Sequence, residues 1–312
     1  MKKTLEQILM ESSKAMLIGI GGGGDVVGTL PTKGLLEMFG TECVLAGLPW
    51  ERSVIDPVPG PRKFNEIVNC EKINEGVWIC NKDTKTDTGV LFAESGISKV
   101  LNTDTLLIDA TIGSENISRY IVDAAARLDI DLIVGIDVGG DAVAVGNEKG
   151  ILSPLADSTM IAALYKTSTS IDTFMGMFGF GSDGELTLDE IEHSLSLLAQ
   201  NSGILGSWGI TQKTLELMNR VMEVVPTEAS RSPVRYAEGQ FKATKIRSGT
   251  VDVDLNFSST STIYIDVEVI YEKVSDLSRA VAGSGDLMES RKILNELGVR
   301  TEFDIEEERY GN

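Results

Sequence analysis

The chain has 312 residues, 42% of them hydrophobic, which is enough to bury a substantial core. Its 47 acidic residues against 28 lysines and arginines give a formal charge of −19. This balance argues against nucleic acid and anionic membrane surfaces as partners, because both attract cationic proteins. The single histidine, His193, excludes chemistry that uses several histidines.

The N-terminal segment and the cysteines indicate the compartment. After two lysines the chain is amphipathic and charged, whereas a secretory signal has an unbroken apolar stretch. No stretch approaches the roughly 20 apolar residues of a membrane span. Cys43, Cys70 and Cys80 lack C-x-x-C spacing, which argues against a zinc site. We therefore expect a cytoplasmic protein that binds a small molecule, and we leave a homo-oligomer open.

Strands and helices alternate through the first half of the sequence. Continuous apolar runs predict buried strands, and amphipathic runs predict helices. In chain order we expect a helix over residues 6–14, a strand over 15–20, a glycine turn over 21–25, a helix ending near 39 and a strand over 43–48. Four prolines predict an irregular loop over 49–64. Then follow a strand over 77–80, a polar stretch over 81–89, a strand over 106–110, a helix over 115–128, a strand over 131–136 and a helix over 158–165. This alternation predicts a doubly wound, mostly parallel, Rossmann-like α/β sheet.

The second half of the sequence begins with two clear helices. Thr187 and Glu190 form a capping box for a helix over 187–200, and a helix over 211–225 ends at Pro226. We expect edge or antiparallel strands over 250–257 and 262–271, helices over 274–281 and 287–297, and a frayed tail over 302–312. A change of composition near residue 226 separates a Rossmann-like ligand-binding core (1–225) from a C-terminal α/β extension (226–312). The sequence leaves open whether both belong to one domain.

A glycine-rich loop follows the first predicted strand. Residues 19–24 (GIGGGG) satisfy the pattern G-x-G-x-x-G. Glycines at this place let the backbone approach a ligand closely, and free amides can bind phosphate. We predict that Gly21, Gly22, Gly23 and Gly24 bind the ligand.

Two features separate this loop from a dinucleotide fingerprint. Asp25 places a negative charge where a pyrophosphate would lie, and Pro31 falls where the following helix should continue. NAD or FAD is therefore the alternative cofactor rather than the first choice. An acid beside a phosphate loop is understandable if a cation lies between them, and Mg²⁺ bridges carboxylates to phosphate in this way.

A second loop of the same type follows the strand over 131–136. Gly139, Gly140 and Asp141 repeat the Gly-Gly-Asp order of residues 23–25, and Asp137 stands just before them. Because the carboxyl ends of parallel strands meet at one edge of a sheet, these loops can converge. We predict that Gly139 and Gly140 contact the ligand and that Asp25, Asp137 and Asp141 bind Mg²⁺.

A third loop, residues 176–185, combines four glycines with two carboxylates. We predict Gly181 and Ser182 as ligand contacts and Asp183 or Glu185 as the general base. Taken alone, each glycine-acid loop is also ordinary turn chemistry.

Other polar residues near strand ends have simpler roles. We expect Asp157 to cap the helix over 158–165. Thr111, after the strand over 106–110, is a candidate ligand contact, although capping the next helix is the favoured role. Candidate clamps for an anion are Arg52, Arg62, Lys63 and Arg231.

Four segments carry a family resemblance: GIGGGGDVVGTLP (19–31), DVGGDAVAVGNE (137–148), SPLADS (153–158) and FGFGSDGEL (178–186). In these the chain resembles a family of archaeal and bacterial proteins described only as a conserved domain of unknown function. The resemblance implies one fold through most of the chain, and it implies no reaction.

The residues themselves favour a metal-assisted hydrolase or transferase that acts on a phosphorylated or nucleotide-like metabolite. A nicotinamide or flavin oxidoreductase is one alternative. A non-catalytic metabolite-binding protein is the other, because a carboxylate looks alike in sequence as base, ligand or cap.

Overall fold

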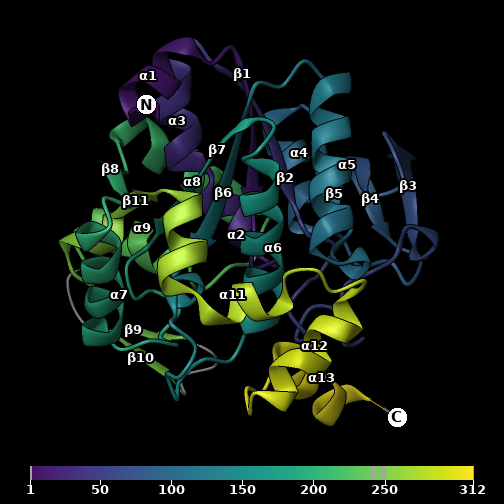
Figure 1. The fold of residues 1–312 in the computed structure, drawn as a ribbon. Helices are drawn as coiled ribbons and strands as arrows, with labels where there is room; N and C mark the ends of the chain where they lie inside the picture. Colours follow the sequence, from purple (N-terminus) through teal and green to yellow (C-terminus); the bar gives the residue numbers. More distant parts are fainter. Residues whose placement is uncertain (1, 241–243, 247–250, 312) are drawn as a thin grey trace.

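The computed structural model describes residues 2–240, 244–246 and 251–311. A mixed sheet of nine strands runs through its centre (Figure 1). In spatial order the strands are β3 (Ile67–Lys72), β4 (Val77–Thr86), β5 (Thr105–Ile108), β2 (Glu42–Gly47), β1 (Lys14–Gly19), β6 (Leu132–Val138), β7 (Asp172–Phe178), β11 (Ser261–Ile265) and β8 (Ile204–Gly209). The five strands from β5 to β7 are parallel, and the strands at both edges pair antiparallel. The predicted α/β class with a mostly parallel, Rossmann-like sheet is confirmed.

Helices cover both faces of this sheet. Side chains of β1 alternate between the faces: Met16 and Ile18 pack into one core, and Ala15 and Leu17 pack into the other. Helices α5 (Ser114–Arg127), α6 (Pro154–Thr167), α7 (Leu188–Gln200), α11 (Asp276–Val281) and α12 (Leu287–Glu296) contribute to the first core. Helices α1 (Leu5–Glu11), α3 (Leu30–Met38), α4 (Ala93–Leu101), α8 (Gln212–Met222) and α9 (Arg231–Ala237) contribute to the second. Burial on both faces explains why β1 and β6 are continuously apolar.

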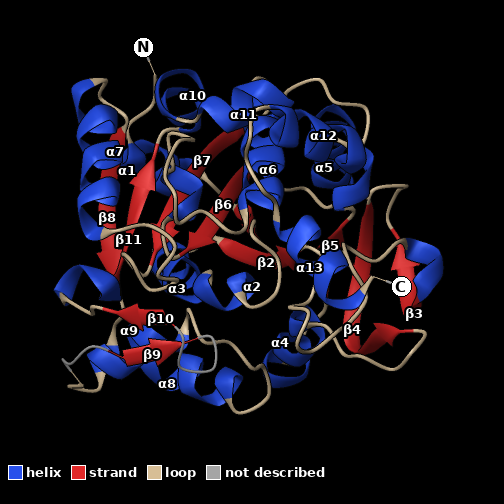
Figure 2. Cartoon of the chain, turned by 90° about the horizontal axis from the view of Figure 1, so that it is seen from below, coloured by secondary structure: helices blue, strands red, loops and turns tan. Residues whose placement is uncertain are grey.

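Shorter elements complete the chain. Figure 2 looks onto the end of the molecule that carries α2 (Asp25–Gly28), α13 (Glu302–Tyr310) and a small sheet of β9 (Thr244–Ile246) and β10 (Val251–Val253). Helix α10 (Val267–Val269) leads into a π-helical turn, η6 (Ile270–Val274), and η1 (Phe64–Glu66), η2 (Ala110–Ile112), η3 (Asp141–Val143) and η5 (Phe257–Thr260) are 3₁₀ turns. None of the described helices is long and apolar enough to cross a membrane.

Several elements differ from the sequence predictions. The strand predicted over 77–80 is longer, since β4 continues through the polar stretch to Thr86 because an edge hairpin with β3 needs only one buried face. The predicted strand over 262–271 ends at Ile265, where Asp266 caps α10 by accepting hydrogen bonds from the amides of Glu268 and Val269. The expected frayed tail is helix α13, which begins at a capping box of Thr301 and Asp304. Part of the strand predicted over 250–257 is β10, and residue 250 lies outside the described residues.

The strand order creates a switch point between β1 and β6. The chain leaves β1 toward β2 on one side, whereas β6 pairs with the other side of β1. Loops that leave such neighbouring strands in opposite directions form a crevice at their carboxyl ends, where ligands bind in open α/β sheets. The loops after β1 and β6 are the two Gly-Gly-Asp loops.

The segment over 226–312, predicted as a C-terminal extension, contributes β11 to the main sheet between β7 and β8. It also contributes α9, the small sheet and the helices from α10 to α13. The division at residue 226 stays a prediction.

Candidate functional site

A cavity of about 780 Å³ lies at the switch point. Its walls are the glycine loop over 21–25, residues 50–54 of the proline-rich loop, the acidic loops after β6 and β7, residues 227–229 and helix α13. The volume falls within the range of about 300–1,000 Å³ that is usual for small-molecule sites. The C-terminal segment therefore closes a site whose floor belongs to the Rossmann-like sheet.

The glycine loop is held tightly against its neighbours. Gly22 has φ +77°, and a Cβ there would lie 2.9 Å from the carbonyl oxygen of Trp50. The amide of Gly21 donates to Asp25 Oδ2 at 3.0 Å, and the amide of Gly23 donates to the Trp50 carbonyl at 2.7 Å. At most the amides of Gly22 and Gly24 are then left for a ligand, so the loop offers fewer phosphate donors than the sequence predicts.

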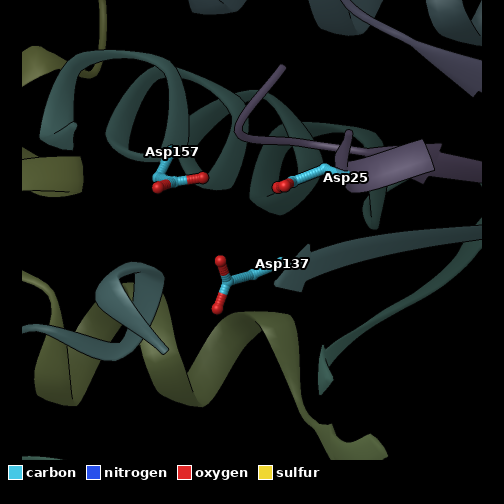
Figure 3. Close-up of side chains that lie close together, drawn as sticks. All are labelled: Asp25, Asp137 and Asp157. Carbon is cyan, nitrogen blue, oxygen red and sulfur yellow. The ribbon is translucent and has the colours of Figure 1, made fainter. Parts of the chain in front are cut away.

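Three aspartates form a first acidic group, which we define as Asp25, Asp137 and Asp157. One carboxylate oxygen of each lies within 4.8 Å of the others. Asp25 follows β1, Asp137 lies in β6 and Asp157 lies in the first turn of α6, so three separate elements supply them. Figure 3 shows the three carboxyls facing a common space. Asp137 Oδ2 and Asp157 Oδ1 are buried and accept no hydrogen bond within the described part of the chain.

The surroundings of this group disfavour the ionised form of its three carboxyls. Burial raises the pKa of Asp137 and Asp157 well above the ordinary value, and the nearby Asp141 raises both further. Burial and Asp141 also raise the pKa of Asp25, while the backbone amides of Gly21 and Val138 lower it in part. Carboxyls in this setting are neutral, share protons or bind a cation.

A second acidic group lies beside the first, and we define it as Asp141, Asp183 and Glu185. Its carboxylate oxygens also lie within 4.8 Å of one another. Glu185 accepts hydrogen bonds from the amides of Leu152 at 2.6 Å and Ser153 at 3.0 Å. Asp183 Oδ2 is buried without a hydrogen-bond partner among the described residues, and burial and Asp141 raise the pKa of Asp183 well above its ordinary value.

Comparison with protein families identifies the family to which the chain belongs. A family model described as "Protein of unknown function (DUF1152)" matches residues 16–310. The chain belongs to the DUF1152 family. Comparison with curated proteins found no match. The resemblance to an uncharacterised conserved family is thus confirmed, while the use of the glycine loops as its signature stays a prediction.

In this DUF1152 chain, Asp157 does not cap a helix as predicted, because it lies within the first turn of α6. Pro154 occupies the first turn of α6, so the helix begins earlier than residue 158 and its N-cap is Ser153. Glu302 of α13 accepts hydrogen bonds from the amides of Leu155 at 3.0 Å and Ala156 at 2.7 Å. Because Glu302 accepts the hydrogen bonds of these amides, the Asp157 carboxyl does not cap them and lines the cavity instead.

Several predicted ligand residues do not line the cavity. Thr111 donates a hydrogen bond to Asp109 at the end of β5 instead. Gly139 packs against Asp183, since a Cβ there would lie 2.2 Å from the Asp183 Cγ, and Gly140 packs against Ile191 and Met177. Gly181 and Ser182 also lie outside the cavity wall, and Ser182 is fully buried. These residues therefore belong to the packing around the acidic loops and do not contact a ligand in the cavity.

Of the residues predicted to clamp an anion, only Arg52 lines the cavity of the described structure. Arg52 pairs with Glu228. Arg62 is buried and pairs with Asp56, and Arg231 donates to the carbonyl of Met222. Lys63 is exposed outside the cavity wall.

Three further glutamates line the cavity: Glu302 and Glu306, which the sequence did not indicate, and Glu51, which the sequence indicated only as a possible ribose-binding acid for a dinucleotide. Glu51 accepts a hydrogen bond from the amide of Ala93 at 2.6 Å, and burial raises its pKa to about 7. Burial also raises the pKa of Glu302 to about 8. Glu306 accepts hydrogen bonds from the Trp50 indole at 3.1 Å and the Gly60 amide at 2.8 Å. The Thr-x-x-Asp box at residues 301–304 was the available signal for the helix that carries two of them.

Proposed function

We propose that the chain is a divalent-cation-dependent enzyme that hydrolyses a phosphorylated or nucleotide-like metabolite or transfers a group from it. The observation that carries this proposal is the first acidic group, in which buried carboxylate oxygens of Asp137 and Asp157 lack donors beside the cavity. Mg²⁺ prefers oxygen ligands and is commonly held by one or two carboxylates together with substrate phosphates.

The energetic argument starts from the cost of burial. An ionised carboxylate removed from water loses several kcal/mol unless a partner compensates it. Among the described residues, no lysine or arginine forms an ion pair with Asp137 or Asp157, and the arginine of the proline-rich loop at the cavity is paired with Glu228. A bound divalent cation would supply the missing compensation for the whole group.

The phosphate in the proposal follows from the arginines that line the cavity. Arg52, Arg300 and Arg309 line the same cavity as Asp25, Asp141, Asp157, Asp183 and Glu185, whereas Asp137 lies beside the cavity wall. A ligand that contacts both the acidic residues and the arginines would bind the cation through one set of oxygens and the guanidinium groups through another. Phosphate has this property, because it bridges Mg²⁺ and arginine.

The proton acceptor of the reaction comes from the second acidic group, as the sequence predicts. Glu185 is bound by the amides of Leu152 and Ser153, whereas Asp183 keeps one oxygen without a donor. With a single cation bound, Asp183 is therefore the better candidate for the general base.

The oxidoreductase alternative has less support. Helix α2 has four residues, so it lacks the long helix whose N-terminus binds a pyrophosphate in dinucleotide folds. Asp25 also accepts a hydrogen bond from the Gly21 amide that such a phosphate would use. We propose in addition a cytoplasmic location, in line with the three free cysteines, and a small molecule as the partner. Self-association into a homo-oligomer stays a prediction.

A two-stage experiment tests the proposal. The metal-free full chain is screened by thermal unfolding against nucleotides and sugar phosphates, with and without Mg²⁺ or Mn²⁺, and the ligands that stabilise it are assayed for phosphate release. We expect stabilisation that requires both cation and ligand, and its loss in Asp157→Asn.

The control variant is Asp109→Asn, which changes a buried carboxyl outside the cavity and should behave like the wild type. Equal stabilisation of the wild type and Asp157→Asn would contradict the cation site. Stoichiometric binding without turnover of any ligand would contradict an enzyme and favour a metabolite-binding protein.

A further inference from the structure

The two acidic groups are not separate clusters, because Asp141 contacts both. Its carboxyl lies within hydrogen-bonding reach of Asp137 in the first group and of Asp183 in the second. A carboxylate placed between two groups of oxygen ligands is the arrangement that joins two metal ions about 3.5–4 Å apart.

We propose that Asp141, Asp183 and Glu185 hold a second divalent cation, and that Asp141 bridges it to the cation of the first acidic group. This inference rests on the proposed function. It also revises one role within it, because Asp183 and Glu185 become cation ligands rather than proton acceptors.

The independent observation for the second cation is Asp183. The residue is 6% exposed, it lines the cavity, and its Oδ2 has no hydrogen-bond partner among the described residues. An unsatisfied buried carboxylate oxygen costs stability, so its retention at a cavity wall needs a reason. A cation beside Asp183 supplies that reason.

The surrounding loops hold these ligands in place before any cation binds. Leu152 and Ser153 donate their amides to one oxygen of Glu185, and the Ser153 hydroxyl lies 2.7 Å from its other oxygen and 3.0 Å from Asp141 Oδ2. Gly139, with φ +127°, leaves the room that the Asp183 carboxyl occupies. Ligands oriented by neighbouring donors are typical of metal sites, because such contacts fix the position of each oxygen.

Charge balance also favours two cations over one. The two acidic groups contain six carboxyls, which carry six negative charges when ionised. One divalent cation compensates two of these charges and two cations compensate four. Two cations leave a charge of −2 on the six carboxyls, which repels a phosphate less than the −4 left by one cation. Paired cations hold the attacking and the leaving oxygen in phosphoryl displacement, and a water bound to them loses its proton readily.

Manganese titration tests this inference without knowledge of the substrate. Mn²⁺ is added to the metal-free full chain, the stoichiometry is measured by calorimetry, and the electron paramagnetic resonance spectrum reports whether two ions are coupled. We expect two Mn²⁺ per chain with a coupled spectrum. Asp183→Asn and Asp157→Asn should each bind one uncoupled ion, and the control Asp109→Asn should match the wild type.

The outcomes separate this inference from the proposed function. One Mn²⁺ in the wild type, lost in Asp157→Asn and kept in Asp183→Asn, overturns the second cation alone. Absence of Mn²⁺ binding in the wild type overturns both. Circular dichroism verifies that each variant folds; if Asp183→Asn does not, Asp141→Asn replaces it, and a coupled spectrum in that variant contradicts the bridging role.

Discussion

The partly buried side chain of Glu302 should make the stability of the protein depend on pH. Its two hydrogen bonds, from the amides of Leu155 and Ala156, attach α13 to the first turn of α6. Burial raises the pKa of Glu302 from 4.5 to about 8, although these amides lower it in part. Replacement by glutamine keeps the size of the side chain and removes its ionisation.

The sign follows from the raised pKa. The folded state favours the protonated carboxyl, so its stabilising contribution is complete below pH 4.5 and is lost as the pH rises through about 8. A shift from 4.5 to about 8 corresponds to a total of about 5 kcal/mol, of which about 4 kcal/mol falls between pH 5 and pH 9. The side chain borders the cavity, and we therefore expect an observed effect of about 2–4 kcal/mol.

Urea denaturation between pH 5 and pH 9, in the presence of a chelator, measures this effect. The free energy of unfolding of the wild type should fall by about 2–4 kcal/mol more than that of Glu302→Gln. Glu302→Gln should also lose a constant 1–3 kcal/mol, roughly, because its amide group faces a backbone donor. Glu192→Gln, an exposed substitution on α7, is the control and should follow the wild type. Parallel curves for the wild type and Glu302→Gln would refute the reasoning.

Two further predictions concern the walls of the cavity. Gly22→Ala should cost more stability than Gly40→Ala, by about 1–3 kcal/mol in thermal or urea unfolding, because both glycines have positive φ but only at Gly22 would a Cβ collide, 2.9 Å from the Trp50 carbonyl. Equal losses would show that the loop is not held by that contact. Arg62→Met should destabilise the protein by about 3–5 kcal/mol, since it leaves the buried Asp56 without its cation; a change below 1 kcal/mol, roughly, would contradict a buried ion pair.

Local patterns accounted for much of the fold. The continuous apolar runs of β1 and β6 are those of strands covered on both faces, and the capping box of Thr187 and Glu190 begins α7 as predicted. The strand β3 and helix α4 were not predicted: β3 is mostly exposed at an edge and lacks a continuous apolar run, and the buried face of α4 includes Glu94, Ser95 and Ser98. Their stability comes from pairing and packing rather than from periodicity.

The tail shows where local patterns mislead. Residues 302–310 are rich in charge, which by itself indicates a solvated segment. Glu302 and Glu306 are nevertheless turned inward, because amides of α6 and of the proline-rich loop and the Trp50 indole donate to them. Burial of a charged residue depends on donors that are distant in sequence, and no local rule supplies them.

The sequence alone determined that glycine and aspartate stand together at the ends of buried strands, and it placed Asp25, Asp137 and Asp141 near one edge of a parallel sheet. Only the tertiary structure decided how the acids are grouped. Asp157 joins Asp25 and Asp137, while Asp141 lies with Asp183 and Glu185. The reason is that strand order and the starting point of α6 fix which carboxyls lie together, and strand order depends on pairing between segments more than a hundred residues apart.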